Sequence, residues 1–125
     1  MNMSLGGKRV LVVEDEMLLA LDLEEGLRDA GCEVIGPAGS VRSALRLAQN
    51  SDIDVAILDV NLAGERVFPV AQVLSERGIP FVFATAYAGS DELYPAEVRD
   101  VPRLAKPYTV GQAVETLDRM VGTPG

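Results

Sequence analysis

The sequence predicts an α/β fold in which helices cover both faces of a doubly wound parallel sheet. Apolar runs alternate with segments of helical periodicity along all 125 residues, as is typical of strand–helix units that build a parallel sheet. The strand segments are apolar almost without interruption, which indicates strands buried on both faces. The length favours a single domain, which we place at residues 8–122, between a flexible amino-terminal tail at 1–7 and a carboxyl-terminal tail at 123–125.

The first half of the chain predicts two strand–helix units. Residues 10–13 form an apolar run that is too short for a buried helix and predicts a central strand. Helical spacing predicts a helix over 19–30, which Gly31 ends in the left-handed conformation that glycine adopts easily. The run 32–35 predicts a second strand, and an amphipathic helix is expected over 41–48.

The third and fourth strands are expected at 55–58 and 81–84, where the apolar run is repeated. Between them, apolar spacing predicts a helix over 67–74. Pro69 then stands in the first turn of that helix, where proline is tolerated. The sequence thus continues the alternation of strand and helix.

The last part of the chain is less uniform. In the segment 88–100, Pro95 would interrupt a helix. A minimal fifth strand is expected at 104–105. The final helix is expected over 110–121, because Thr109 and the glutamine three residues later form a capping box.

The composition narrows the classes of function. Hydrophobic residues make up 48% and charged residues 24% of the chain, a globular balance. The net charge of −8 disfavours nucleic acid or an anionic membrane as a partner, because both require a basic face. The absence of histidine and the single cysteine exclude a histidine-dependent triad, a histidine metal site and an internal disulfide. No apolar run is long enough to span a membrane, and we expect a cytoplasmic protein.

Polar residues stand at the carboxyl ends of four expected strands: Glu14 and Asp15, Asp59, Thr85, and Lys106. The carboxyl ends of parallel strands meet at one edge of the sheet, where ligands bind, so we expect these side chains to converge. Acids on neighbouring strands about 5 Å apart repel each other and require a cation or a raised pKa. Oxygen ligands without histidine or cysteine favour Mg²⁺ or a similar ion.

The same residues suggest a phosphoryl-transfer site. Lys106 is a point charge that could neutralise a phosphoryl oxygen, and Thr85 offers a hydroxyl donor. An exposed carboxylate is the best acceptor, since no histidine, serine or cysteine is placed as an activated nucleophile. Each acid alone could be an ordinary helix cap or dipole partner. Their joint placement at one edge of the sheet favours a phosphoryl-transfer site instead.

Residues 8–122 resemble the receiver domain of two-component response regulators. Four motifs carry the resemblance, in this order: Val12-Val13-Glu14-Asp15-Glu16, Ile57-Leu58-Asp59-Val60-Asn61, Ala84-Thr85-Ala86 and Lys106-Pro107. The ordered set is far more specific than any single motif. The resemblance implies a five-stranded parallel sheet of order 2-1-3-4-5, the flavodoxin-like arrangement also found in CheY.

The resemblance also implies the chemistry. Asp59 would accept a phosphoryl group from a phosphohistidine on a sensor histidine kinase or a histidine phosphotransfer protein. Glu14, Asp15, Asp59 and the backbone carbonyl of Asn61 would hold Mg²⁺ or Mn²⁺. Receivers of this family catalyse their own phosphorylation and dephosphorylation and are not turnover enzymes on an external substrate.

Further roles follow from the family pattern. Thr85 would bind the phosphoryl group and draw its loop inward, Lys106 would pair with Asp59 or the phosphate, and the Lys106–Pro107 bond would be cis. Most receivers carry a tyrosine or phenylalanine switch residue three positions before the lysine, where this chain has Arg103. Tyr87 is the candidate substitute, with an ordinary surface or core tyrosine as the alternative.

The stretch 80–87 resembles the FATGUY subgroup, whose members are often stand-alone receivers, although Ala86 replaces the motif's glycine. We therefore expect no DNA-binding output domain, signalling by contact with an unknown downstream protein, and a monomer or weak homodimer. Leu18 and Leu21 lie off the buried stripe of the first helix and would suit docking of the histidine-bearing partner. The alternative is a first helix that is buried more broadly.

Three other functions compete with this prediction. A pseudo-receiver would act as an interaction module without phosphorylation, although Asp59, Thr85 and Lys106 argue against it. A flavodoxin-like FMN-binding protein needs a phosphate loop after the first strand, where the acids of this chain would repel a phosphate. A dehalogenase-type phosphatase would require a second aspartate at Asn61.

Overall fold

The computed structural model describes residues 4–122, and residues 1–3 and 123–125 lie outside the described part. Five parallel strands form the sheet: β1 (Arg9–Val13), β2 (Glu33–Ala38), β3 (Val55–Asp59), β6 (Phe81–Thr85) and β7 (Arg103–Ala105). Their order is β2-β1-β3-β6-β7, which is the predicted order 2-1-3-4-5 counted over the strands of this sheet. The predicted doubly wound, flavodoxin-like fold is confirmed.

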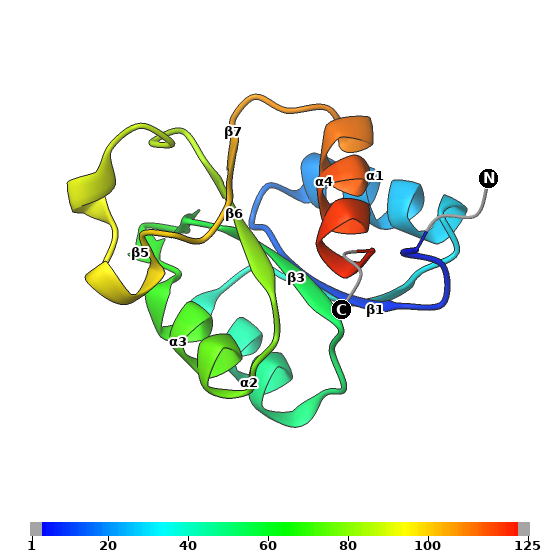
Figure 1. Ribbon diagram of the computed structural model, residues 1–125, viewed down its shortest axis with the longest axis horizontal. Coiled ribbons are helices and arrows are strands. Elements are labelled where there is room, and N and C mark those ends of the chain that lie inside the picture. Colours follow the sequence, from blue (N-terminus) through cyan, green and yellow to red (C-terminus); the bar gives the residue numbers. More distant parts are fainter. Residues whose placement is uncertain (1–3, 123–125) are drawn as a thin grey trace.

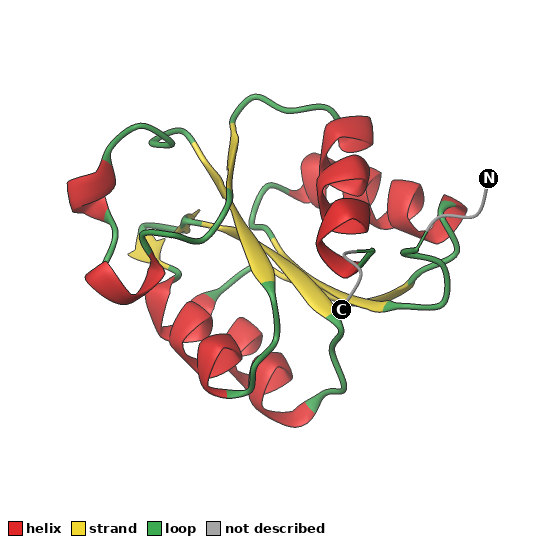
Figure 2. Cartoon of the chain, viewed as in Figure 1, coloured by secondary structure: helices red, strands yellow, loops and turns green. Residues whose placement is uncertain are grey.

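Two helices pack on each face of the sheet. α1 (Met17–Asp29) and α4 (Val110–Val121) cover one face, and α2 (Val41–Asn50) and α3 (Phe68–Glu76) cover the other (Figure 1). Each pair closes over its own apolar cluster, and the side chains of the central strands alternate between the two clusters. The layered arrangement is also clear in Figure 2, where the strands lie between the two helical layers. Strands buried on both faces explain the nearly continuous apolar runs in the sequence.

Local sequence signals fix several helix starts. Thr109 Oγ1 accepts a hydrogen bond from the Gln112 amide at 3.0 Å, and Gln112 Oε1 accepts one from the Thr109 amide at 2.8 Å. This is the predicted capping box at the start of α4. Ser40 caps α2 through a 3.1 Å bond from the amide of Ser43, and Pro69 stands in the first turn of α3.

The amino-terminal residues differ from the prediction of a flexible tail over 1–7. Leu5 is fully buried and belongs to the cluster beneath α1 and α4. Its amide donates to Asp118 Oδ1 at 2.9 Å, and the amide of Gly7 donates to the carbonyl of Gly31 at 2.8 Å. Residues 4–7 therefore pack against the domain, while the remaining tail residues at 1–3 and 123–125 lie outside the described part of the chain.

The connection between β6 and β7 contains no α-helix. It has two 3₁₀ turns, η1 (Asp91–Leu93) and η2 (Ala96–Val98), and Pro95 stands directly before the second. This agrees with the expected interruption at Pro95, because a proline lacks the amide that a continuous helix needs. Within residues 4–122, no helix is long and apolar enough to cross a membrane.

A short antiparallel hairpin, which was not expected, follows β3. It pairs β4 (Asn61–Leu62) with β5 (Glu65–Arg66). Its turn requires positive φ at Ala63 (49°) and Gly64 (87°), and the glycine adopts this conformation at little cost. The hairpin brings backbone from the β3–α3 connection beside the carboxyl edge of the sheet.

Candidate functional site

The strand register explains why distant residues meet. Val13 pairs with Leu58 across β1 and β3, so Glu14 and Asp59 follow side by side. Likewise, Asp59 pairs with Ala84, and Thr85 pairs with Ala105, the residue before Lys106. The predicted convergence at one edge of the sheet is therefore a direct result of the parallel topology.

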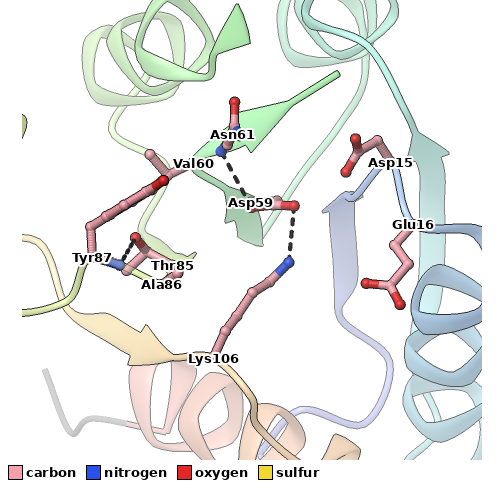
Figure 3. Close-up of a pocket in the computed structure, with 9 residues that line it drawn as sticks. All are labelled: Asp15, Glu16, Asp59, Val60, Asn61, Thr85, Ala86, Tyr87 and Lys106. Carbon is pink, nitrogen blue, oxygen red and sulfur yellow. Dashed lines mark hydrogen bonds and ion pairs between the residues drawn. The ribbon is translucent and has the colours of Figure 1, made fainter. Parts of the chain in front are cut away.

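A pocket of about 340 Å³ opens at this edge (Figure 3). Its lining residues are Asp15, Glu16, Asp59, Val60, Asn61, Thr85, Ala86, Tyr87 and Lys106. Seven of these are polar or aromatic residues that the sequence analysis named: Asp15, Glu16, Asp59, Asn61, Thr85, Tyr87 and Lys106. The pocket is polar and open, as a site for a charged group requires.

Three carboxylates form an acidic cluster. Glu14, Asp15 and Asp59 each offer an oxygen within 4.8 Å of the others. Glu14 and Asp59 are buried at 3% and 5% exposure, whereas Asp15 is exposed. The Oε1 atom of Glu14 is buried and has no hydrogen-bond partner. A hard divalent cation fits this set of oxygen donors, and the buried Oε1 atom, which accepts no hydrogen bond, shows where negative charge needs compensation.

Lys106 supplies positive charge to the same cluster. Its Nζ atom lies 3.0 Å from Asp59 Oδ2 and 3.3 Å from Glu14 Oε1. Figure 3 shows the side chain reaching across the pocket to Asp59. The Lys106 amide also donates to the carbonyl of Thr85 at 2.9 Å, and the Lys106–Pro107 bond is cis, as the resemblance implied.

The burial of these charges changes how they titrate. Burial raises the pKa of Glu14 to about 7, and the neighbouring charge of Asp59 adds to the shift. The hydrogen bond from the Glu16 amide, at 3.0 Å, and the charge of Lys106 act in the opposite direction. Burial by itself lowers the pKa of Lys106, but the hydrogen bond and charge of Asp59, with those of Glu14, raise it above its ordinary value. The site thus holds a proton or a cation near its acids at neutral pH.

The Asp15 carboxylate is tied to the unexpected hairpin. Its Oδ2 atom accepts a hydrogen bond from the amide of Ala63 at 2.9 Å. The amide of Asn61 in turn donates to Asp59 Oδ1 at 3.3 Å. Sequence reasoning missed Ala63, because a backbone contact leaves no signal in the residue type.

Tyr108 was also missed. Its hydroxyl is buried and has no hydrogen-bond partner. Burial, together with the charges of Glu14 and Asp59, raises the pKa of Tyr108. Its position directly after the Lys106-Pro107 motif was the available signal.

Thr85 and Tyr87 lie together at one side of the pocket. Thr85 is buried, and its Oγ1 atom accepts a hydrogen bond from the Tyr87 amide at 2.9 Å (Figure 3). Tyr87 is 42% exposed, and the guanidinium carbon of Arg66 lies 5.4 Å from the centre of its ring. Arg103 does not line this pocket and instead contacts the β6–β7 connection.

An exposed apolar surface adjoins the pocket. Leu18 and Leu21 on α1 are 75% and 51% exposed, and Met17 beside them is 74% exposed. The alternative of a first helix buried more broadly is therefore wrong. Leu18 also lines a neighbouring pocket of about 430 Å³ with Lys106 and other residues.

Comparison with known proteins identifies relatives. The family model for the response regulator receiver domain matches residues 10–118. The transcriptional regulatory protein PdtaR of Mycobacterium tuberculosis H37Rv is 31% identical over 116 residues, which cover 91% of this chain and 57% of that protein. The chain thus spans little more than half the length of this curated relative.

Solved structures agree with the fold. SdrG from Sphingomonas melonis Fr1 is 41% identical, with 94% of this chain and 98% of that chain covered and a TM-score of 0.74. The receiver domain of the sensor histidine kinase PA1611 from Pseudomonas aeruginosa PAO1, which has a magnesium ion in its active-site cleft, is 23% identical, with 94% and 100% covered and a TM-score of 0.79. Membership of the FATGUY subgroup stays a prediction. The match over most of its length shows that the chain belongs to the receiver-domain family of two-component response regulators.

Proposed function

We propose that this receiver takes a phosphoryl group on Asp59 and signals through the resulting change in conformation. The observation that supports this most strongly is the position of the Asp59 carboxylate. It lies 3.0 Å from the Lys106 ammonium group, within the acidic cluster and on the wall of an open pocket. A buried carboxylate held by a cation at a solvent-accessible pocket is suited to act as a nucleophile.

Glu14, Asp15, Asp59 and the backbone carbonyl of Asn61 are the proposed holders of Mg²⁺ or Mn²⁺. The magnesium ion in the related PA1611 receiver supports this assignment. The three carboxylate oxygens within 4.8 Å of one another support it too, because the buried Glu14 Oε1 among these residues accepts no hydrogen bond. When bound, the ion supplies positive charge that reduces repulsion between the acids and the incoming phosphoryl oxygens. Lys106 and Thr85 contact the same phosphoryl oxygens directly, Lys106 as a cation and Thr85 as a hydroxyl donor.

The proposed transfer makes and breaks one bond to phosphorus. An Asp59 carboxylate oxygen bonds to phosphorus, while the phosphohistidine nitrogen of the donor leaves with the electron pair of the P–N bond. Reset occurs when water attacks phosphorus, which releases inorganic phosphate, regenerates the Asp59 carboxylate and passes a proton to solvent. The receiver catalyses both of these steps on itself and turns over no external substrate.

The proposed donor is a sensor histidine kinase or a histidine phosphotransfer protein. Met17, Leu18 and Leu21 form an exposed apolar surface next to the pocket, which would accept the apolar face of a helix that carries the histidine. We also propose that the protein is a single domain with a cytoplasmic location, that it is a monomer or weak homodimer, and that its downstream target is another protein, as yet unknown.

Mass spectrometry with a small acyl phosphate donor and Mg²⁺ tests the proposal. The wild-type protein should gain one phosphoryl group, and Asp59→Asn should gain none while its circular dichroism spectrum stays unchanged. Asp52→Asn removes the same charge from a side chain that is 84% exposed at the opposite end of the sheet and should be phosphorylated normally. A modified Asp59→Asn protein would show that the acceptor is another residue, and an unmodified wild-type protein would favour the pseudo-receiver.

A further inference from the structure

Arg103 makes an unusually dense set of contacts from the edge strand β7. Its side chain is 10% exposed. Nη1 donates to the carbonyl of Ala88 at 2.8 Å and to Asp91 Oδ1 at 2.7 Å, and Nη2 donates to the carbonyl of Arg99 at 3.2 Å. The guanidinium carbon also lies 3.8 Å from the centre of the Tyr94 ring. One side chain therefore holds both ends and the middle of the β6–β7 connection.

The connection has little regular structure to hold it otherwise. It appears in Figure 1 as a wide yellow-green loop that stands away from the helices α1 and α4. Its only described helical turns are η1 and η2, of three residues each. Its internal anchor is Tyr94, which is 1% exposed and packs edge-on or tilted against Phe68 and Phe83. The Arg103 guanidinium group lies over the same ring, so the buried anchor and the hydrogen bonds depend on one side chain.

The pocket and this connection share a short stretch of backbone. Thr85 Oγ1 accepts from the Tyr87 amide at 2.9 Å, and the next residue, Ala88, accepts from Arg103. A movement of the Thr85 hydroxyl toward a phosphoryl group on Asp59 would strain this hydrogen bond and pull on the Tyr87 amide. Because Ala88 is covalently attached to Tyr87, the displacement acts directly on the carbonyl that Arg103 holds.

We infer that Arg103 is a positioning residue that fastens residues 88–99 to β7 and couples them to Thr85. This inference rests on the proposed phosphorylation of Asp59, which loosens the fastening through Ala88. The coupling then needs no rotation of an aromatic side chain at position 103. The guanidinium group is essential, because its planar fork binds several acceptors and stacks on a ring, whereas a lysine ammonium group cannot do both.

Hydrogen exchange measured by mass spectrometry tests this coupling in the full chain. In the wild-type protein, protection of amides in 88–99 should fall when an acyl phosphate and Mg²⁺ are added. In Arg103→Lys, protection should already be lower by roughly tenfold, the loss of about one hydrogen bond to a charged group. Addition of the phosphate donor should then change it little further, while the mass spectrum still shows the phosphoryl group.

Arg77→Lys is the matched control, because Arg77 also donates to two backbone carbonyls, but to those of Ala48 and Ser51 at the end of α2 and not to any in 88–99. It should behave as the wild type in 88–99. Asp91→Ala removes one exposed acceptor of Arg103 with little risk to folding, and it should lower protection in 88–99 by a smaller factor.

Two results would overturn the inference. One is wild-type protection of 88–99 in both Arg103→Lys and Asp91→Ala before phosphorylation. The other is an equal fall in protection on phosphorylation in Arg103→Lys and the wild type, which a merely structural role would give. If no protein gains a phosphoryl group, the proposed function fails, and the exchange data taken without the donor still decide whether Arg103 fastens the segment.

Discussion

At the scale of single residues, Glu14 combines deep burial with a carboxyl group that ionises. It is almost fully buried, and its pKa is raised to about 7, chiefly by burial. In an unfolded chain a glutamate ionises near pH 4.3. The folded state therefore holds a proton more tightly than the unfolded state, and ionisation of Glu14 opposes folding.

The consequence is a pH dependence of stability without divalent metal. The unfolding free energy should fall by up to about 3 kcal/mol as the pH rises from 5 to 8, because the unfolded chain releases the Glu14 proton first. Urea denaturation in the presence of a chelator measures this slope. Glu14→Gln should flatten it, whereas the exposed Glu76→Gln control should not. An unchanged slope in Glu14→Gln would assign the effect to another group.

At the scale of elements, α1 and α4 approach each other closely at one glycine. A Cβ atom on Gly26 would overlap the Val110 side chain of α4. Gly111, near the start of α4, has no such neighbour, since the nearest atom to its added Cβ is Thr109 Oγ1 at 3.8 Å. Gly26 thus allows the close packing of α1 against α4, whereas Gly111 makes no such contact, although both lie in helices.

Alanine substitutions at the two glycines should have opposite or unequal effects on the unfolding free energy. Gly26→Ala should lower the unfolding free energy by about 1–3 kcal/mol through overpacking, and the added Val110→Ala should recover part of the loss. Gly111→Ala should leave stability unchanged or raise it by about 0.5–1 kcal/mol, because alanine restricts the unfolded chain. Urea denaturation of the three variants gives both values. Equal effects of the two single substitutions would contradict the close approach of α1 and α4.

The elements that the sequence predicted are those with strong local patterns. The apolar runs at β1, β3 and β6 and the Thr109 capping box depend on neighbouring residues, and the parallel topology then placed Asp59 beside Glu14. The misses are contacts between distant parts of the chain. The amide of Leu5 donates to Asp118 in the last helix, and the interactions of Arg103 depend on how the connection folds back. No local periodicity contains that information.

At the scale of the whole molecule, a cation at the acidic cluster should stabilise the entire fold. Mg²⁺ at roughly 100 times its Kd adds about 2.7 kcal/mol to the unfolding free energy if it binds only the folded state. This should raise the Tm by on the order of 10 °C, as measured by calorimetry. Asp15→Asn should reduce the Mg²⁺-dependent rise, and the remote Asp52→Asn should keep it. An equal rise in both variants would place the cation elsewhere.

The strand order also divides the molecule by its resistance to local opening. The acidic cluster lies at the carboxyl ends of β1 and β3, and each of these strands is hydrogen-bonded on both sides. Arg103 stands on β7, a border strand of three residues with one neighbour. Since opening begins where fewest contacts must break, the β7 border can detach while β1 and β3 keep their pairing. The topology therefore permits a transiently opened state in which β7 has separated from the sheet while the three carboxylates stay together.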